Sequence, residues 1–196
     1  GNISCTRLAR YLHDNRQPGY EFLYGIPGTI AGAVSMNAGA FEKEIMPYVH
    51  SLDLLDENGA IYTLRNNEIS YSYRASNIDE KSIIISVKLL KQTSNFDMNL
   101  LNLLNQKRKI SQPINQLSCG CIFKNPPHKY ASKLIEGANL KGKRFGGIYI
   151  SRKHSNYFIN DGSGTYTDFL VLLRRVKEVI ASKFSVKLDE EVILLK

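Results

Sequence analysis

The chain has 196 residues, of which 43% are hydrophobic and 22% are charged, so its composition predicts a buried core and excludes general disorder. No apolar run reaches the length of about 20 residues that a membrane helix needs, and the polar start shows no secretory signal. The net charge of +8 favours anionic partners, but the basic residues are scattered and no nucleic-acid-binding signature is present. The three cysteines, too few for a disulfide scaffold and odd in number, indicate a reducing, cytoplasmic setting.

The first expected element is a helix over residues 4–15, where Leu8, Tyr11 and Leu12 recur at roughly helical spacing. Two residues could cap its start, Ser4 and Thr6. A segment rich in glycine and small residues follows.

Residues 49–65 predict a hairpin, because two alternating runs flank a Glu-Asn-Gly turn. Residues 82–91 predict another strand, which is expected to be buried on both faces near its start. The character of the sequence changes around residues 92–95, so a domain boundary is expected near residue 94.

The second half begins with an amphipathic helix expected over residues 96–109, with Met98, Leu101 and Leu104 on one side. The later expected elements are a helix over 129–140 that stops near Gly142, short strands at 146–150 and 156–160, a helix over 167–184 that starts at Thr or Asp, and a strand over 186–196. The pattern as a whole is typical of an α+β protein.

The glycine-rich segment reads "GIPGTIAGAVSMNAGA" over residues 25–40, and Pro27 stiffens its turn. Glycines let backbone N–H groups approach a ligand closely. Gly28 and Thr29 lead into a small-residue helix, whose start would present N–H groups to an anion. The spacing matches neither the dinucleotide nor the Walker motif, so the pattern alone leaves a structural turn and a cofactor cradle equally open.

This segment resembles the signature of the UDP-N-acetylenolpyruvoylglucosamine reductases, flavoenzymes of peptidoglycan precursor synthesis. The resemblance continues through "YSYRAS", "QPINQLSCGCIFKNP", "ASKLIEGANLKGKRFGG", "SRKHSNYFIN" and "LDEEV". These blocks lie in family order across nearly the whole chain, and the second half resembles the shorter structural form of the family.

The resemblance implies that residues 1–94 are the second half of a bipartite FAD-binding domain and that residues 95–196 are a smaller α+β substrate-binding domain. The family's first FAD-binding subdomain, with a Gly-x-Gly-Ser-Asn loop for the pyrophosphate, would precede Gly1. The sequence is therefore expected to be a fragment of a longer protein.

The implied reaction begins with reduction of FAD by NADPH. The flavin N5 then passes a hydride to the enolpyruvyl group of UDP-N-acetylglucosamine enolpyruvate, which gives UDP-N-acetylmuramate. The expected protein is a cytoplasmic monomer that acts on a small-molecule UDP-sugar, without nucleic acid, metal or membrane span. The residues expected to line the FAD are Gly25, Ile26, Pro27, Gly28, Thr29, Asn37, Ala38, Gly39 and Ala40.

Three residues match the catalytic positions of the family. Cys121 stands where the family usually has the serine that protonates the substrate, and a thiol is a much stronger acid than a hydroxyl. Arg74 matches the arginine expected to hold the carboxylate or the developing enolate. Glu191 matches the C-terminal glutamate because it directly precedes valine, with Glu190 as the competing choice; Ile193 departs from the family's usual arginine.

The residues alone leave other interpretations of Cys121 open. A zinc site would need a second cysteine pair, and only His128 is nearby. A disulfide with Cys119 is sterically awkward and unexpected in cytosol. Without the resemblance, a simply buried thiol would be preferred.

Further residues are expected to bind substrate because they match family blocks or could reach its diphosphate or sugar. They are Tyr73, Arg108, Lys124, Asn125, Lys153, His154 and Asn156. For His154 a structural role is slightly favoured over direct contact.

Two rival functions remain open at this point. One is another flavin oxidoreductase of the same FAD-binding architecture, against which "FKNP" and "LDEEV" argue. The other is a truncated, non-catalytic module that binds UDP-sugars.

Overall fold

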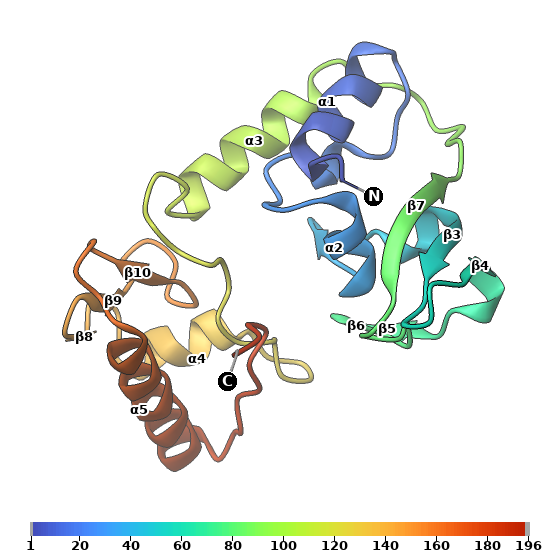
Figure 1. The fold of residues 1–196 in the computed structure, drawn as a ribbon. Helices are drawn as coiled ribbons and strands as arrows, with labels where there is room; N and C mark the ends of the chain where they lie inside the picture. Colours follow the sequence, from blue (N-terminus) through green and yellow to red (C-terminus); the bar gives the residue numbers. More distant parts are fainter. Residues whose placement is uncertain (1, 195–196) are drawn as a thin grey trace. The chain divides into compact units, whose positions relative to one another are not determined.

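The computed structural model describes residues 2–194, and the chain forms two compact units that divide after Arg108 (Figure 1). The sequence instead suggests a boundary near residue 94. Residues 95–108 belong to the first unit because the Arg108 side chain packs against Gly25. It lies so close that a Cβ added to Gly25 would be 2.8 Å from Arg108 Cδ. Its guanidinium carbon also lies 5.4 Å from the centre of the Phe41 ring. The division into functional domains stays a prediction.

The first unit combines short helices with antiparallel strands. Its elements are α1 (Cys5–Asp14), η1 (Glu21–Leu23), α2 (Ile30–Ser35), β1 (Gly39–Ala40), β2 (Lys43–Glu44), η2 (Met46–Tyr48), β3 (Val49–Leu55), β4 (Ile61–Arg65), η3 (Asn66–Glu68), β5 (Tyr71–Ser72), β6 (Ala75–Ser76), β7 (Ile83–Leu89) and most of α3 (Leu100–Ser111). The strands form a sheet in the order β4-β3-β7 and the pairs β1-β2 and β5-β6.

The expected hairpin is confirmed as β3 and β4, whose turn is built by Asp56 and Gly59. Asp56 Oδ1 accepts the backbone N–H groups of Asn58 and Ala60 at 2.8 Å each, and Gly59 takes φ +82°. The expected burial of both faces of β7 is wrong, because Ile83 is 63% exposed. Ile84, Val87 and Leu89 of β7 pack against the core, whereas Ile83 and Ile85 are exposed, as in an antiparallel sheet with one solvated face.

The expected first helix is confirmed as α1, which is capped by Ser4. The Ser4 hydroxyl accepts the Arg7 N–H at 3.2 Å. The buried residues of α1 are Cys5 and Ala9, whereas Tyr11 is 61% exposed. The apolar spacing therefore located the helix, although Tyr11, one of the spaced apolar positions, is exposed.

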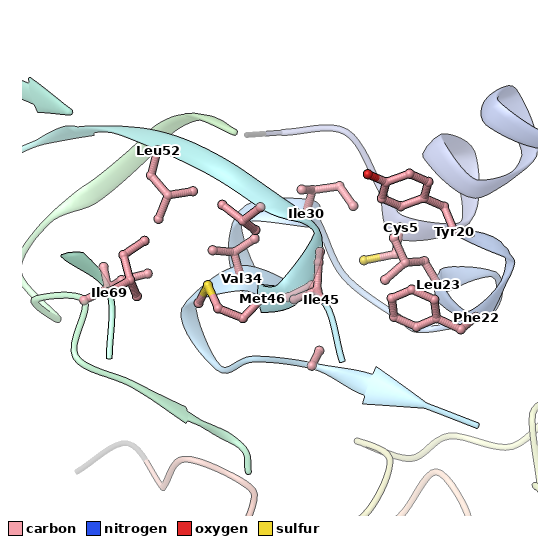
Figure 2. Packing of buried hydrophobic residues seen from close by; sticks show 14 of the residues in the cluster. Cys5, Tyr20, Phe22, Leu23, Ile30, Val34, Ile45, Met46, Leu52 and Ile69 are labelled. Carbon is pink, nitrogen blue, oxygen red and sulfur yellow. The ribbon is translucent and has the colours of Figure 1, made fainter. Parts of the chain in front are cut away.

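The core of the first unit lies where α1, η1, α2 and β3 converge. Cys5, Leu23, Val34 and Leu52 come from these four elements and are fully buried, as Figure 2 shows. Burial raises the pKa of the Cys5 thiol to about 11, against a lowering by a backbone hydrogen bond. Cys5 is therefore a structural thiol at neutral pH.

Gly39 is a glycine at which a side chain has no room. An added Cβ would lie 2.1 Å from the Lys43 carbonyl oxygen and 3.0 Å from the Glu44 Cα, both on the paired strand β2. Gly39→Ala is expected to lower the free energy of unfolding by about 1–3 kcal/mol, the usual cost of overpacking.

The matched control for that prediction is Gly32→Ala in α2, where the nearest atom would be the Thr29 hydroxyl at 3.7 Å. This change should stabilise the protein by up to about 1 kcal/mol, because alanine favours helix. Urea unfolding of both variants measures the difference. Equal stabilities would show that the tight β1-β2 pairing does not require glycine.

The second unit packs two helices with a small antiparallel sheet. Its elements are α4 (Ala131–Gly137), β8 (Arg144–Phe145), β9 (Ile148–Ile150), β10 (Phe158–Asn160) and α5 (Tyr166–Phe184). The sheet order is β10-β9-β8, and α4 and α5 lie against each other (Figure 1). Fully buried side chains of its core include Ile135, Ile150 and Ile180.

The two ends of the second unit differ from the sequence expectation. The helix α5 starts earlier than expected, because Thr165 caps it by accepting the Asp168 N–H at 3.1 Å while Asp168 accepts the Thr165 N–H. The strand expected over 186–196 is wrong for the residues described, where Glu190 forms only an isolated bridge with Phe123. Within residues 2–194, no helix has the length and apolarity to cross a membrane.

Candidate functional site

The glycine-rich turn of the first unit presents backbone at its surface. Gly28 has φ +97° and no atom within 4 Å of where a Cβ would stand, so its Cα faces open space. Thr29 caps α2 and accepts the Gly32 N–H at 3.3 Å. The helix start therefore offers fewer N–H groups to an anion than the sequence suggests. Of the remaining residues in the turn, Gly25 and Ile26 are half-buried and Pro27 is exposed.

Asn37, expected to line the FAD, points its side chain into the unit. It is fully buried and has φ +47°. Its Nδ2 donates to Glu44 Oε2 at 2.8 Å and to the Ser72 carbonyl at 2.9 Å, and its Oδ1 accepts the Met46 N–H at 3.1 Å. The side chain therefore fixes the loop. Ala38 is buried as well, while Gly39 and Ala40 are half-buried.

Arg74 lies against this same loop. Its guanidinium donates to the Gly39 carbonyl at 2.9 Å and to the Asn37 carbonyl at 3.3 Å. Its guanidinium carbon lies 4.9 Å from the ring centre of Tyr73, another expected site residue. The fold thus brings together Arg74 and the segment expected to hold the flavin, although more than 30 residues separate them.

Glu44 is a member of this site that sequence reasoning missed. Its Oε1 lies 4.0 Å from Arg74 Nη1, and its other oxygen accepts from Asn37. One carboxylate therefore contacts both the loop and the guanidinium. No motif marked it, because it follows the glycine-rich block as one of several charged residues.

In the second unit, residues 121–124 run between two other segments. On one side the Ile122 N–H donates to the Asn156 carbonyl at 2.9 Å, and Cys121 bridges Tyr157. On the other side the Glu191 N–H donates to the Ile122 carbonyl at 2.8 Å. The backbones of Cys121 and Glu191 are therefore held next to each other, and both residues are half-buried.

Glu190, the competing glutamate, has a structural partner. Its Oε1 accepts from Lys177 Nζ at 2.6 Å. Burial raises the pKa of Glu190, but the hydrogen bond and charge of Lys177, helped by a backbone hydrogen bond and by Lys187, outweigh it and leave the pKa lowered. Glu190 is thus committed to α5, which supports the choice of Glu191.

The two residues after the aromatic Phe123 have different roles in the fold. Lys124 is half-buried and donates its backbone N–H to the Asp189 carbonyl at 2.9 Å. Asn125 accepts the Ala131 N–H at 3.0 Å and so holds the start of α4. Both remain candidate substrate ligands.

The block around His154 divides between surface and interior. Lys153 is exposed, and its ammonium donates to the Lys109 carbonyl. Burial, chiefly, lowers the pKa of His154; the charge of Lys141 adds to this, while a backbone hydrogen bond opposes it. The His154 ring lies 4.8 Å from the Tyr157 ring. Asn156 is 3% exposed, with both side-chain polar atoms engaged by the backbone of Phe123.

The second unit also has a basic cavity that the sequence did not reveal. Its volume is about 830 Å³. The residues that line it include Lys109, Gln112, Tyr149, Ser151, Arg152 and Lys153. Three of them are cations and none of the described lining is acidic, so the cavity suits an anion.

These candidate residues come from both units. Arg74 belongs to the first, and Cys121 and Glu191 belong to the second. Their meeting around one substrate stays a prediction.

Comparison with known proteins shows which class of protein the second unit resembles. Residues 112–195 match the family model described as "UDP-N-acetylenolpyruvoylglucosamine reductase, C-terminal domain". The second unit is therefore such a domain, in the α+β fold expected. Over nearly its whole length, the chain is similar to UDP-N-acetylenolpyruvoylglucosamine reductases.

The similarity to individual relatives extends over nearly all of the chain. It is 42% identical to UDP-N-acetylenolpyruvoylglucosamine reductase of Caldanaerobacter subterraneus subsp. tengcongensis, over 96% of this chain and 64% of the relative. It is 40% identical to the UDP-N-acetylenolpyruvoylglucosamine reductase of Streptococcus pyogenes serotype M12, over 97% of this chain and 64% of that relative. The chain thus spans 64% of the length of these curated relatives.

A solved structure shows the same fold. The crystal structure of UDP-N-acetylenolpyruvylglucosamine reductase from Thermus caldophilus matches with a TM-score of 0.82 and 29% sequence identity, over 95% of this chain and 68% of that chain. The expected α+β fold and the family resemblance are confirmed.

Proposed function

We propose that this chain carries the substrate-side residues of a cytoplasmic enzyme that reduces the enolpyruvyl group of UDP-N-acetylglucosamine enolpyruvate, for peptidoglycan synthesis, with NADPH as reductant. The observation that carries the proposal is the arrangement of residues 121–124, which holds Cys121 beside Glu191 while Glu190 is paired with Lys177. Cys121, at the position that protonates the substrate in the family, thus lies beside Glu191 in the chain's backbone arrangement.

The first unit fits a flavin at the glycine-rich turn. Gly28 leaves open space over its Cα, and the backbone of residues 39–40 is half-buried next to Arg74. Such a surface admits a flat ring close to the backbone. Gly25 to Thr29 and Gly39 to Ala40 would hold FAD, and Asn37 and Ala38 would support the loop from within. The chemistry that a bound FAD would supply there is hydride transfer, with NADPH as the reductant.

Hydride addition to the enolpyruvyl double bond leaves an enolate, which must receive a proton on carbon. Cys121 would donate that proton from its thiol, since a thiol is a strong enough acid to protonate an enolate. Arg74 would hold the carboxylate and the enolate charge through its fixed guanidinium. Glu191 would polarise the enol or help to move the proton.

The remaining charge of the substrate is its diphosphate. The basic cavity with Lys109, Arg152 and Lys153 suits this group, because clustered cations attract phosphate oxygens. Lys124 and Asn125 would contact the diphosphate or sugar near Cys121.

The test is the visible absorption spectrum of the purified chain and of the longest polypeptide that its gene encodes, each with and without added FAD. Anaerobic NADPH is then added, followed by the enolpyruvyl UDP-sugar. We expect a yellow flavoprotein that bleaches with NADPH and recovers its colour with the substrate.

Other outcomes identify the rival functions. Bleaching without recovery on addition of the enolpyruvyl sugar would favour another flavin oxidoreductase. No bound flavin in any preparation, together with calorimetric binding of the UDP-sugar, would favour the non-catalytic binding module.

A further inference from the structure

Residues 121–124 sit in the middle of a three-segment backbone arrangement in the second unit. Besides the bonds of Ile122 already described, the Lys124 N–H donates to the Asp189 carbonyl at 2.9 Å, and Phe123 bridges Glu190. The segment therefore takes its position from residues 156–157 on one side and 189–191 on the other. These contacts are non-local, because about 30 or more residues of chain separate each partner from the segment.

The Asn156 side chain supplies an additional pair of hydrogen bonds to this segment. Its Oδ1 accepts the Phe123 N–H at 3.0 Å, and its Nδ2 donates to the Phe123 carbonyl at 2.8 Å. The amide thus pairs with Phe123 as a peptide group of a neighbouring strand would. Phe123 itself is 1% exposed and packs edge-on against Phe158, so it cannot shift without losing core contacts.

We propose that Asn156 is a positioning residue that fixes the proton donor Cys121 and the diphosphate candidate Lys124 through the backbone of Phe123; this inference rests on the proposed function. Asn156 is 3% exposed, and both polar groups of its amide are used by Phe123. Asn156 therefore acts through the backbone of Phe123. The family resemblance had instead suggested that it contacts the substrate.

Removing the amide leaves the buried Phe123 N–H and carbonyl without their partner, and each such group costs about 1–3 kcal/mol unless the backbone moves to water. Movement of Phe123 carries Cys121 and Lys124 with it, since they are two residues and one residue away. A misplacement of about 1 Å in a reacting group can cost about 10²-fold in rate.

Two variants separate positioning from general stability. Asn156→Ala removes both hydrogen bonds, whereas Asn156→Asp keeps the acceptor for the Phe123 N–H and places a carboxylate oxygen, in place of the donor, against the carbonyl. The Asp variant keeps the size of the side chain, so the proposal stays testable if Asn156→Ala does not fold.

The matched control is Asn160→Ala. Asn160 also makes a side-chain clamp in this unit: its Oδ1 accepts the N–H groups of Gly162 and Gly164 at 2.8 and 2.9 Å. It holds the turn before α5 and not residues 121–124, so its loss should lower the melting temperature without altering Cys121.

The first measurement is the rate at which iodoacetamide alkylates Cys121 in the native protein, read from fragment-ion masses that separate Cys121 from the exposed Cys119 of the same peptide. We expect the Asn156 variants to change this rate at least about fivefold, a differential effect of about 1 kcal/mol. Asn160→Ala should leave it unchanged, and Cys5 should stay unlabelled in every variant because it is buried. This readout needs no flavin.

The second measurement follows the two half-reactions in the FAD-loaded protein. Asn156 variants should lower kcat for the enolpyruvyl sugar by about 10- to 100-fold, leave flavin reduction by NADPH unchanged, and raise KM for the sugar, because Lys124 moves together with Phe123. Wild-type alkylation and kcat in both Asn156 variants would overturn the proposal. A wild-type protein inactive toward the sugar would overturn the proposed function instead, and alkylation would still decide the role of Asn156.

Discussion

Cys121→Ala is expected to lower the rate of enolpyruvyl reduction by about 10²–10⁴-fold, the usual contribution of a positioned general acid. The reason is that the enolate left by hydride addition would lose the thiol that protonates it. Flavin reduction by NADPH should be unaffected, because it involves no proton from this position. Stopped-flow absorbance under anaerobic conditions measures the two half-reactions separately.

Two further variants make that result specific to the proton. Cys121→Ser restores an O–H donor at nearly the same place and should keep substantial turnover. Cys119→Ala removes a thiol from the same loop, only two residues earlier, and should behave as wild type. If Cys121→Ala reduces the sugar at the normal rate, the proton comes from elsewhere and the thiol is structural.

Local patterns predicted the elements whose signals are local. Alternation and an Asn-Gly turn located β3 and β4, and helical spacing located α1 and α5. Errors arose where burial depends on partners far away in the sequence. Ile83 is exposed because only Ile84, Val87 and Leu89 of β7 pack against the core, and the residues of a strand do not show which of them other elements will cover.

The candidate site shows the same limit. The family resemblance picked out Arg74 and Cys121 one by one, but not what fixes them. Arg74 depends on Glu44 and on the carbonyls of the glycine-rich loop, and residues 121–124 depend on the Asn156 amide from 33 positions away. A single buried asparagine carries no spacing signal, so only the fold reveals it.

The adjacent residues Glu190 and Glu191 should respond differently to substitution, because their contacts differ. Glu190 has its carboxylate 2.6 Å from the Lys177 ammonium, and both side chains are about a third exposed. Removal of the Glu190 carboxylate should lower the free energy of unfolding by up to about 1 kcal/mol, as for other partly exposed ion pairs. It should have little effect on activity. Glu191 instead donates its backbone N–H to the Ile122 carbonyl, next to Cys121, the proposed proton donor.

Glu191→Gln is therefore expected to slow enolpyruvyl reduction by about 10²-fold, because an amide can neither take up nor pass on a proton. Glu190→Gln, the matched control, should keep at least about half of the turnover while its melting temperature falls slightly. Single-turnover oxidation of the reduced flavin by the sugar gives the rates, and thermal unfolding gives the stabilities. Equal rate losses in the two variants would mean that the charge of this C-terminal segment matters and not the position of Glu191; a loss confined to Glu190→Gln would assign the catalytic role to Glu190.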